Sequence, residues 1–351
     1  MSTLEELGCT PEILRHAEKH IKKGFSLARV VEEHRQRYSI QNERFEMTAR
    51  IAGRMMYRAK SRNDYPAVGD WVLASGYENR EQAVIQHILP RTTLLERKAP
   101  GKRTENQIIA TNIDEVFIVL PLDQTFNPGK LERALVLVQE SGASPVVALS
   151  KKDLFPPEML PSILTEAQTA CGRIPLIAYS AFDAGSLRDL CLLIRPKKTY
   201  CLIGPSGSGK STLINILIGS EILPTGEVRS FDAKGRHTTS ARQLLVRAAG
   251  GIFIDTPGIR EIGLWETGSG LQETFDDIDQ LARECRFRDC THNHEPLCAV
   301  RRAVEEGALS PVRHEHYLQL QKELHHLDSK IVQGRGKKTS QKDRKSAGRR
   351  S

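Results

Sequence analysis

Hydrophobic and polar positions follow different periods in successive parts of the 351-residue chain. Residues 1–38 are predicted to be helical, because Thr10-Pro11 places an N-cap before a proline at the first helical position, and Ser26 is a candidate cap for a second helix. A poorly packed extension is the alternative for this segment. Residues 40–110 alternate apolar and polar positions in short runs separated by glycine and proline, with expected strands near 45–52, 68–75, 82–89 and 93–97. A small β-barrel fits these runs, although alternation alone does not choose among β folds.

From Asp114 onward, apolar strands alternate with amphipathic helices. Strands are expected near 116–120, 145–149, 174–179, 200–203, 243–248 and 251–254, and helices near 130–140, 157–170, 186–194 and 211–218. Alternation at this spacing predicts an α/β fold with a doubly wound, mainly parallel sheet. Past Asp276 the chain is expected to be helical around a group of cysteines, with a last helix near 311–330.

Composition describes a globular protein of two or three domains, with 39% hydrophobic and 27% charged residues. That balance excludes a wholly disordered chain. No apolar run approaches the roughly 18–20 residues of a membrane span, and residues 1–40 lack the apolar core of a signal peptide. We therefore expect a cytoplasmic protein with no membrane partner.

The net charge of +8 is concentrated at the C-terminus. Residues 334–351 hold eight Lys or Arg residues against the single Asp343, a net of +7 that leaves +1 for residues 1–333. Such a segment, without apolar periodicity, is expected to be disordered on its own. Its charge suits a polyanion, and the alternative is a tail that only aids solubility.

A second group of cations lies between the expected strands, from Arg50 through Gly53-Arg54-Met55-Met56-Tyr57-Arg58 to Lys60 and Arg62. Cations for phosphates together with an aromatic ring suit single-stranded or looped RNA. An ordinary solvated loop is the alternative.

The most specific motif is Gly204-Pro205-Ser206-Gly207-Ser208-Gly209-Lys210-Ser211, a complete GxxxxGK[ST] phosphate-binding loop between an expected strand and helix. Its glycines let backbone N–H groups surround a phosphate at a helix N-terminus. Lys210 is expected to reach the β- and γ-phosphates, and the Ser211 hydroxyl to bind Mg²⁺. These residues and Thr212 form the predicted phosphate site.

Asp255-Thr256-Pro257-Gly258 follows the last apolar strand. An Asp at the end of such a strand is expected close to Mg²⁺, and the Gly258 N–H is suited to sense a γ-phosphate. DxxG alone is a weak motif, but downstream of a phosphate-binding loop it supports a nucleotide switch.

Recognition of the nucleotide base is assigned to Ser150-Lys151-Lys152-Asp153. This segment follows the strand near 145–149 and resembles the guanine-binding NKxD motif. The Asp153 carboxylate can accept two hydrogen bonds that guanine offers and adenine does not, and the Lys stem can lie over the base. Ser150 replaces Asn and so removes one amide that this motif offers. Ser180-Ala181 resembles the loop that supports the base in GTPases.

The order of these motifs is a rotation of the usual one. A Ras-like GTPase has its phosphate loop first, then the first switch, DxxG, the base motif and the SA loop. Here the order is SKKD (150–153), SA (180–181), phosphate loop (204–211), GRHTT (235–239) and DTPG (255–258). Such a circular permutation is tolerable because the natural ends of a sheet built from local strand–helix units lie close together. With PAVGDWV at 66–72, this order resembles the circularly permuted GTPase family called ribosome small-subunit-dependent GTPase A (RsgA, also YjeQ).

That resemblance covers roughly residues 40–330 and implies both domains and a role. The implied arrangement is an OB-fold RNA-binding β-barrel (39–110), a permuted GTPase domain (111–265) and a mostly helical zinc domain (266–332). The helical extension (1–38) and the disordered basic tail (333–351), which the residues themselves predict, depart from the family pattern. The implied role is late maturation of the small (30S) ribosomal subunit, with rRNA bound and GTP hydrolysed slowly unless the subunit stimulates it. The expected partners are this subunit, its rRNA and other 30S assembly factors, and we expect a monomer.

Three of the seven cysteines lie close together in the pattern Cys285-x₄-Cys290-x-His292-x₅-Cys298. In a reducing compartment, grouped cysteines favour a metal over disulfides. Three thiolates and one imidazole form a closed tetrahedral set for one structural Zn²⁺. His294 competes for the fourth position, and the family resemblance favours His292. Free thiols are the alternative.

The motifs do not reveal the group that activates water. Many GTPases orient the water with a Gln directly after DxxG, but Ile259 occupies that position and cannot bind water. A slow intrinsic rate follows. The family resemblance favours His237 in the GRHTT loop as the catalytic residue, and a structural histidine is the alternative. Thr238 or Thr239 is the expected switch ligand of Mg²⁺, and the sequence does not separate them.

Together these motifs predict a switch in which GTP, bound with Mg²⁺, orders loops near 230–240 and 255–263, and hydrolysis releases them. Two other functions stay open. An RNA-binding assembly scaffold with incidental nucleotide hydrolysis is favoured by Ile259 and opposed by Lys210, Ser211 and Asp255. A P-loop ATPase is disfavoured by Asp153.

Overall fold

The computed structural model describes residues 2–34, 37–76, 82–98, 106–123, 126–219, 242–247, 250–255 and 269–323. The chain divides into two compact units, Met1–Gly263 and Leu264–Ser351. Among the described residues, no helix is both long enough and apolar enough to cross a bilayer.

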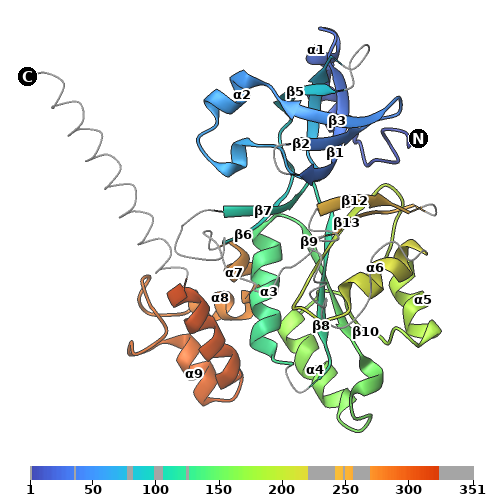
Figure 1. Cartoon of the computed structure of the whole chain (residues 1–351). Helices are drawn as coiled ribbons and strands as arrows, with labels where there is room; N and C mark the ends of the chain where they lie inside the picture. Colours follow the sequence, from blue (N-terminus) through green and yellow to red (C-terminus); the bar gives the residue numbers. More distant parts are fainter. Residues whose placement is uncertain are drawn as a thin grey trace, which may run out of the picture. The chain divides into compact units, whose positions relative to one another are not determined.

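A closed five-stranded β-barrel forms the N-terminal part of the first unit (Figure 1). Its strands are β1 (Ser26–His34), β2 (Arg37–Gln41), β3 (Glu46–Ile51), β4 (Trp71–Ser75) and β5 (Ala83–Ile88), with the short helices α2 (Gly53–Arg58) and η1 (Arg62–Asp64) between β3 and β4. The strands pair in the order β1-β2-β3-β5-β4, and β4 pairs back with β1. Side chains such as Val30, Ile40, Val72 and Ile85 fill the interior. The predicted barrel is confirmed.

The second N-terminal helix expected at Ser26 is wrong. Helix α1 (Pro11–Ile21) forms as predicted, and the Thr10 hydroxyl accepts a hydrogen bond from the Ile13 N–H at 3.4 Å. Ser26–His34, however, is strand β1, with five consecutive buried residues. They are buried on both sides because Ala28 faces the barrel core while Leu27 shares a core with Ile13 of α1. A strand covered on both faces lacks the alternation by which strands are identified from sequence.

The rest of the first unit is a doubly wound α/β sheet. Strands β8 (Glu115–Pro121), β9 (Ser144–Ser150), β10 (Leu176–Ala178), β11 (Thr199–Ile203), β12 (Arg242–Val246) and β13 (Ile252–Asp255) lie in the order β10-β9-β8-β11-β13-β12. Neighbours are parallel except for β12, which runs antiparallel to β13. The predicted α/β sheet is confirmed.

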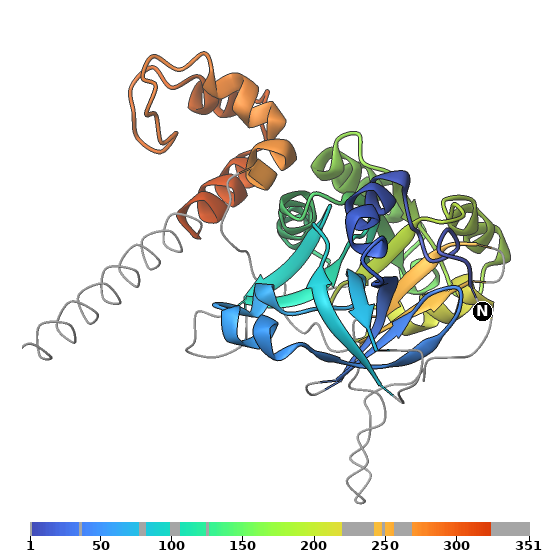
Figure 2. The same cartoon turned by 90° about the horizontal axis from the view of Figure 1, so that it is seen from above.

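Helices cover both faces of this sheet (Figures 1 and 2). Helices α3 (Pro128–Glu140) and α4 (Leu160–Cys171) share one core with Ile118, whereas α5 (Ala184–Leu192) and α6 (Lys210–Ile218) share another with Phe117. Adjacent residues of one strand thus point to opposite helix layers, as the pleat requires. The hairpin of β6 (Leu94–Lys98) and β7 (Asn106–Thr111) leads from the barrel to the sheet and adds Leu95 and Ile109 to the first core.

Barrel and sheet are joined by strand pairing between β1 and β12. Glu32 lies opposite Gln243, and Glu33 lies opposite Arg242. The Glu33 carboxylate forms ion pairs with Arg242 at 3.6 Å and with Arg62 from the short helix η1. Strand β12 therefore belongs to the sheet on one side and to the barrel on the other.

A buried arginine makes a second connection. The Arg29 side chain of β1 donates hydrogen bonds to the carbonyls of Leu7, Gly69 and Asn112, and its guanidinium lies 5.4 Å from the centre of the Trp71 ring. Complete burial lowers the pKa of Arg29 to about 10, although the negative charges of Asp114 and Asp70 act to raise it. One cation thus links the N-terminal segment, the barrel and the entrance to the sheet.

The second unit is mainly helical in its described part. It contains α7 (Ser269–Thr274), α8 (Asp276–Ala282), α9 (Ala299–Glu305) and a helical stretch over 311–323. Phe275 is fully buried, 5.4 Å from the Tyr317 ring between centroids and 4.6 Å from the Arg313 guanidinium. Arg313 also donates to the Asp277 carboxylate at 2.7 and 2.8 Å, which fixes the last helix against α8. The part of this helix expected beyond residue 323 lies outside the described residues.

Candidate nucleotide site and metal centre

The predicted nucleotide motifs follow strands that are parallel neighbours. The phosphate loop follows β11, the SKKD segment begins at the end of β9, Ser180-Ala181 follows β10, and Asp255 ends β13. The carboxyl ends of parallel strands share one edge of the sheet, where ligands of open α/β sheets bind. Motifs that are up to 105 residues apart in the chain, from Ser150 to Asp255, are therefore brought to one edge.

Glycine is required at the start of the phosphate loop. Gly204 has φ +150°, and a Cβ built there would lie 2.1 Å from the Val119 carbonyl oxygen. Gly207 and Gly209 also have positive φ, at 77° and 87°. The first glycine lets the loop pass directly over β8, and the last one precedes α6, whose first turn carries Lys210, Ser211 and Thr212.

The Lys210 ammonium lies within the loop to which the residue belongs. Its Nζ donates to the carbonyls of Gly204 at 2.9 Å and Pro205 at 2.7 Å. Burial lowers the pKa of Lys210 to about 8, while the charge of Asp255 acts in the opposite direction. The interaction places Asp255 in the same electrostatic site as Lys210, as a group near Mg²⁺ would be.

Ser150 lies beneath the phosphate loop. The side chain is buried, and its hydroxyl donates to the carbonyl of Ser208 at 2.8 Å, with the Leu120 carbonyl at 3.4 Å. Burial raises the pKa of Tyr179, while a hydrogen bond with Ser150 acts in the opposite direction. The residue that departs from the NKxD pattern thus contacts the phosphate loop through its side chain. The Ser208 hydroxyl is itself buried and has no hydrogen-bond partner in the described part of the chain.

The other segments predicted to bind the base contact each other. Lys151 has a left-handed backbone with φ +61°, which turns the chain into a short 3₁₀ helix over Lys152–Leu154. The Lys152 ammonium lies 3.1 Å from the Asp183 carboxylate, and this hydrogen bond is the main reason that the pKa of Asp183 is lowered. Asp183 also caps α5 by accepting from the Gly185 N–H at 3.0 Å. Asp153 is exposed at this edge of the sheet.

Asp183 and Tyr179 are residues that the sequence analysis did not single out. Asp183 has a local signature, since an Asp two residues before a glycine at a helix start is a typical N-cap. Tyr179 has none, because its contact with Ser150 depends on the parallel pairing of β10 with β9. Five residues predicted for the switch and its chemistry, His237, Thr238, Thr239, Gly258 and Ile259, lie outside the described residues.

A second site lies in the other unit, where Cys285, Cys290, His292 and Cys298 converge. One ligand atom from each residue lies within 4.8 Å of the others. The Sγ atoms of Cys285 and Cys298 are 3.8 Å apart, and His292 Nδ1 is 3.6 and 3.5 Å from them. A tetrahedral Zn²⁺, with bonds of about 2.3 Å to sulfur and about 2.0–2.1 Å to nitrogen, needs S–S edges of about 3.8 Å and S–N edges of about 3.6 Å. The described cluster therefore fits a tetrahedral ion.

His292 supplies the fourth side chain of this cluster. Its left-handed backbone, φ +60°, turns the ring toward the sulfurs, and its carbonyl accepts from His314 Nε2 at 3.1 Å. Burial lowers the pKa of His292, which favours the neutral imidazole that a metal binds. The competing His294 lies outside the four-residue cluster.

Comparison with known proteins gives a consistent result. A family model described as RsgA GTPase matches residues 88–265. The chain is 45% identical over 305 residues to the Small ribosomal subunit biogenesis GTPase RsgA 1 of Oceanobacillus iheyensis, covering 87% of this chain and 86% of that protein. It is 39% identical over 346 residues to the Small ribosomal subunit biogenesis GTPase RsgA of Leptospira interrogans, covering 98% of this chain and 94% of that one. The chain belongs to the RsgA GTPase family.

Solved structures resemble this RsgA-family chain along most of its length. YjeQ from Thermotoga maritima superposes with a TM-score of 0.65 at 25% identity, covering 86% of this chain and 98% of that one. YloQ, described as a circularly permuted GTPase, superposes with a TM-score of 0.62 at 24% identity, covering 86% and 96%. The permuted order expected from the motifs is thus found in the sheet, where the phosphate-loop strand β11 follows β8, β9 and β10 in sequence but lies between β8 and β13 in space.

Proposed function

We propose that this protein hydrolyses GTP and assists the biogenesis of the small ribosomal subunit. The observation that carries the proposal is the Ser150–Ser208 hydrogen bond, which joins the SKKD segment to the phosphate loop at one edge of the sheet. A phosphate chain at the loop and a base at Asp153 would be parts of one ligand. The relative with 45% identity is named a small ribosomal subunit biogenesis GTPase, which supports the second half of the proposal.

Each polar group has a proposed task in hydrolysis. The backbone of Gly204–Ser211 surrounds the phosphates and Lys210 neutralises the β- and γ-oxygens, because the ammonium already lies inside the loop. Ser211 and Asp255 are proposed to hold Mg²⁺, which stabilises charge on the same oxygens when bound. Thr238 or Thr239 supplies the switch ligand.

Activation of water is proposed to depend on the subunit. Ile259 stands where many GTPases have the water-orienting Gln, so the unstimulated rate is slow. His237, in the GRHTT segment that precedes β12 in sequence, is proposed to orient the water once the subunit is bound.

The nucleotide state is proposed to reach the RNA-binding barrel through β12. This strand follows the GRHTT loop in sequence and pairs with β1 of the barrel. Glu33 of β1 extends the contact to Arg62 beside the cationic helix α2. Ordering of the loop by GTP would therefore act on a strand that is part of the barrel's own hydrogen-bonded sheet.

The domain arrangement is proposed as the sequence implies it, with β1 included in the barrel. An RNA-binding barrel precedes a permuted GTPase domain, a zinc domain in which Cys285, Cys290, His292 and Cys298 hold one structural Zn²⁺, and a basic tail. Four protein ligands leave no position for a reacting water, so the metal would stabilise the fold. The proposed partners are 30S rRNA and other assembly factors of that subunit, bound by a cytoplasmic monomer.

Nucleotide competition tests the enzyme assignment. GTP, and not ATP, is expected to displace labelled GDP, and Lys210→Ala is expected to abolish tight binding because it removes the cation inside the loop. Equal displacement by ATP would instead support a P-loop ATPase.

The alternative function is an RNA-binding assembly scaffold with incidental hydrolysis, which Ile259 favours. Single-turnover hydrolysis with and without 30S subunits separates the two. A scaffold binds the subunit without faster hydrolysis, whereas the proposed enzyme is stimulated.

A further inference from the structure

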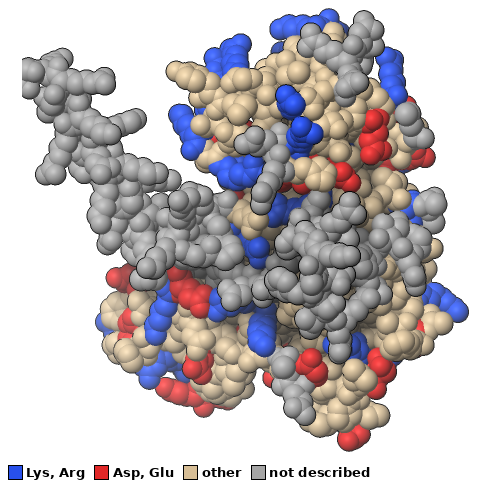
Figure 3. Space-filling model, in the orientation of Figure 1, with Lys and Arg blue, Asp and Glu red and all other residues tan. Residues whose placement is uncertain are grey.

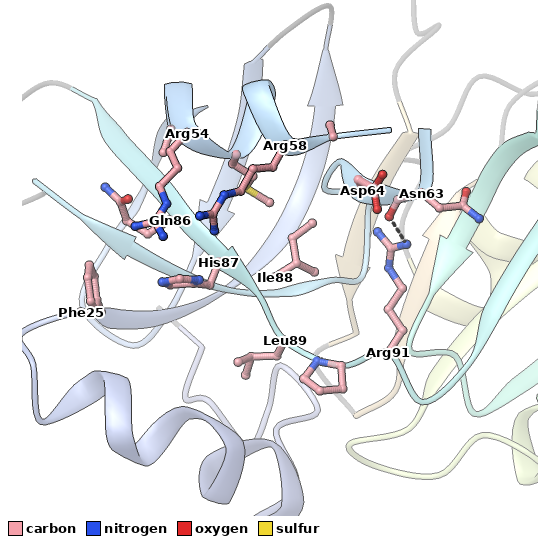
Figure 4. A pocket seen from close by; sticks show the side chains of 14 residues that line it. Phe25, Arg54, Arg58, Asn63, Asp64, Gln86, His87, Ile88, Leu89 and Arg91 are labelled. Carbon is pink, nitrogen blue, oxygen red and sulfur yellow. Dashed lines mark hydrogen bonds between the residues drawn. The ribbon is translucent and has the colours of Figure 1, made fainter. Parts of the chain in front are cut away.

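A pocket of about 690 Å³ lies on the barrel, between α2, β5 and the turn that follows α1. Its volume is within the usual range for ligand sites. Figure 4 shows Arg54 and Arg58 reaching from α2 toward Gln86 and His87 of β5, with Phe25 bordering the same space. The pocket contains none of the residues assigned to nucleotide or metal.

Two cations in this pocket have no partner among the described residues. Arg54 and Arg58 are four residues apart on α2, so they share one side of the helix, and both are exposed. Arg91, at the pocket edge, is by contrast held by the buried Asp70 carboxylate at 2.7 and 2.8 Å. Asp64, the one carboxylate among the described lining residues, already accepts two backbone N–H groups at 2.7 and 2.9 Å. Arg54 and Arg58 are therefore available for an anion.

The opposite wall carries aromatic rings. The His87 ring lies edge-on to Phe25, with centroids 6.0 Å apart and an interplanar angle of 88°, and its centroid is 4.9 Å from that of His20. Partial burial lowers the pKa of His87, as do the charges of His20 and Arg54, and this favours the neutral ring. The Phe25 and His87 rings offer a surface on which a base can stack. The guanidiniums of Arg54 and Arg58, which no described residue pairs with, can bind a phosphate.

We propose that this pocket binds one unstacked nucleotide of single-stranded RNA, with its phosphate on Arg54 and Arg58 and its base against Phe25 and His87. Proteins recognise unpaired RNA by stacking splayed bases on aromatic side chains and contacting the backbone with cations. The inference rests on the proposed function, which makes rRNA the partner, and adds the place where the RNA binds. That place is the α2–β5 side of the barrel, whereas OB-type barrels usually bind nucleic acid on the face of their second and third strands.

The surface beside the pocket suits an RNA chain more than a free nucleotide. Figure 3 shows Lys and Arg side chains gathered over the side of the barrel that carries α2. On the same helix, Tyr57 is 92% exposed and Met56 is 52% exposed, and neither lines the pocket. A strand seated in the pocket would thus find a further ring and further cations for the nucleotides next to it.

Fluorescence anisotropy with a labelled, unstructured 12-nucleotide RNA tests the proposal on the full-length protein. The double variant Arg54→Ala/Arg58→Ala is expected to bind at least tenfold more weakly, and the slope of log affinity against log salt to fall by about 0.7 for each phosphate that the variant no longer neutralises. The matched control is Arg37→Ala/Arg44→Ala, which removes two exposed charges of the same barrel outside the pocket. It is expected to change affinity less than threefold. Equal losses in both variants would overturn the proposal.

The contribution of the aromatic rings of the pocket is tested separately. Phe25→Leu keeps an apolar side chain and is expected to weaken RNA binding by about 5- to 150-fold, the range for removal of one base–aromatic stack. Unchanged GDP affinity verifies that the variant is folded. Photo-crosslinking of RNA that contains 5-iodouridine is expected to label Phe25 or His87. Wild-type affinity of Phe25→Leu, or crosslinks found only outside the pocket, would contradict the assignment.

Discussion

Replacement of Ser150 by alanine separates two tasks that the SKKD segment could perform. The Ser150 hydroxyl donates to the Ser208 carbonyl at 2.8 Å, and both residues are buried. Alanine removes the donor and leaves a buried carbonyl without this partner, a loss that costs about 1–3 kcal/mol. If the loop needs this bond to hold a phosphate, nucleotide affinity falls by about 5-fold to at most about 150-fold, because about 1.4 kcal/mol corresponds to a factor of ten.

The base dependence of that loss identifies its cause. Because the hydroxyl contacts the phosphate loop, Ser150→Ala is expected to weaken GTP and inorganic triphosphate, which has no base, by the same factor. Ser150→Thr is the matched control, since it keeps the hydroxyl and is expected to retain most of the affinity.

Competition against a fluorescent GDP analogue measures these constants for each variant. Two results would contradict a role of the Ser150–Ser208 hydrogen bond in phosphate binding. One is a wild-type affinity of Ser150→Ala for both ligands, which would mean that the loop does not need the hydrogen bond. The other is a loss confined to GTP, which would assign the hydroxyl to the base.

Four further predictions concern the same two sites. Burial gives Lys210 a pKa of about 8, and bound phosphates favour its charged form, so GTP affinity is expected to fall, by up to about tenfold per pH unit, as the pH rises above about 8; a flat pH profile of the dissociation constant argues against this. Asp153→Asn is expected to weaken GTP far more than ATP in competition titrations, and equal losses would mean that Asp153 does not bind the base. A chelator is expected to release zinc and unfold residues 280–300 locally, seen by hydrogen exchange, while GTP binding persists; native protein without zinc by elemental analysis contradicts the metal site. His237→Ala is expected to leave GTP affinity within a few-fold but to lower subunit-stimulated turnover by about 100-fold or more, and full stimulated turnover would place the catalytic group elsewhere.

Local sequence patterns predicted the sheet and the phosphate loop well. The strand before Gly204 and the helix after Lys210 were expected within one residue of their bounds, because a buried strand, a glycine-rich turn and a helix start all follow from neighbouring residues. The spacing of the three cysteines likewise predicted that their thiols converge with one imidazole, and the family resemblance favoured His292 over His294, as in the observed cluster.

Features that depend on distant residues could not be predicted. Strand β1 has no visible alternation, since α1 covers the face that the barrel core does not. The cationic segment before Lys60 was described only as a connection between strands, but Gly53–Arg58 is a helix whose arginines line a pocket with residues of β5. The position of Ser150 under Ser208 depends on the pairing of β9, β8 and β11. In each case the contacting residue belongs to another element of the chain, and hydrophobic periodicity within one segment does not indicate such contacts.

The rate of GTP hydrolysis as a function of added 30S subunits shows whether this protein is a subunit-stimulated GTPase. Single-turnover hydrolysis is measured with wild-type protein and with Lys210→Ala, and 50S subunits serve as the control. We predict a slow basal rate that rises and saturates with 30S concentration, is not raised by 50S subunits and is absent in Lys210→Ala. A basal rate that stays unchanged at saturating 30S would contradict the account and favour the scaffold.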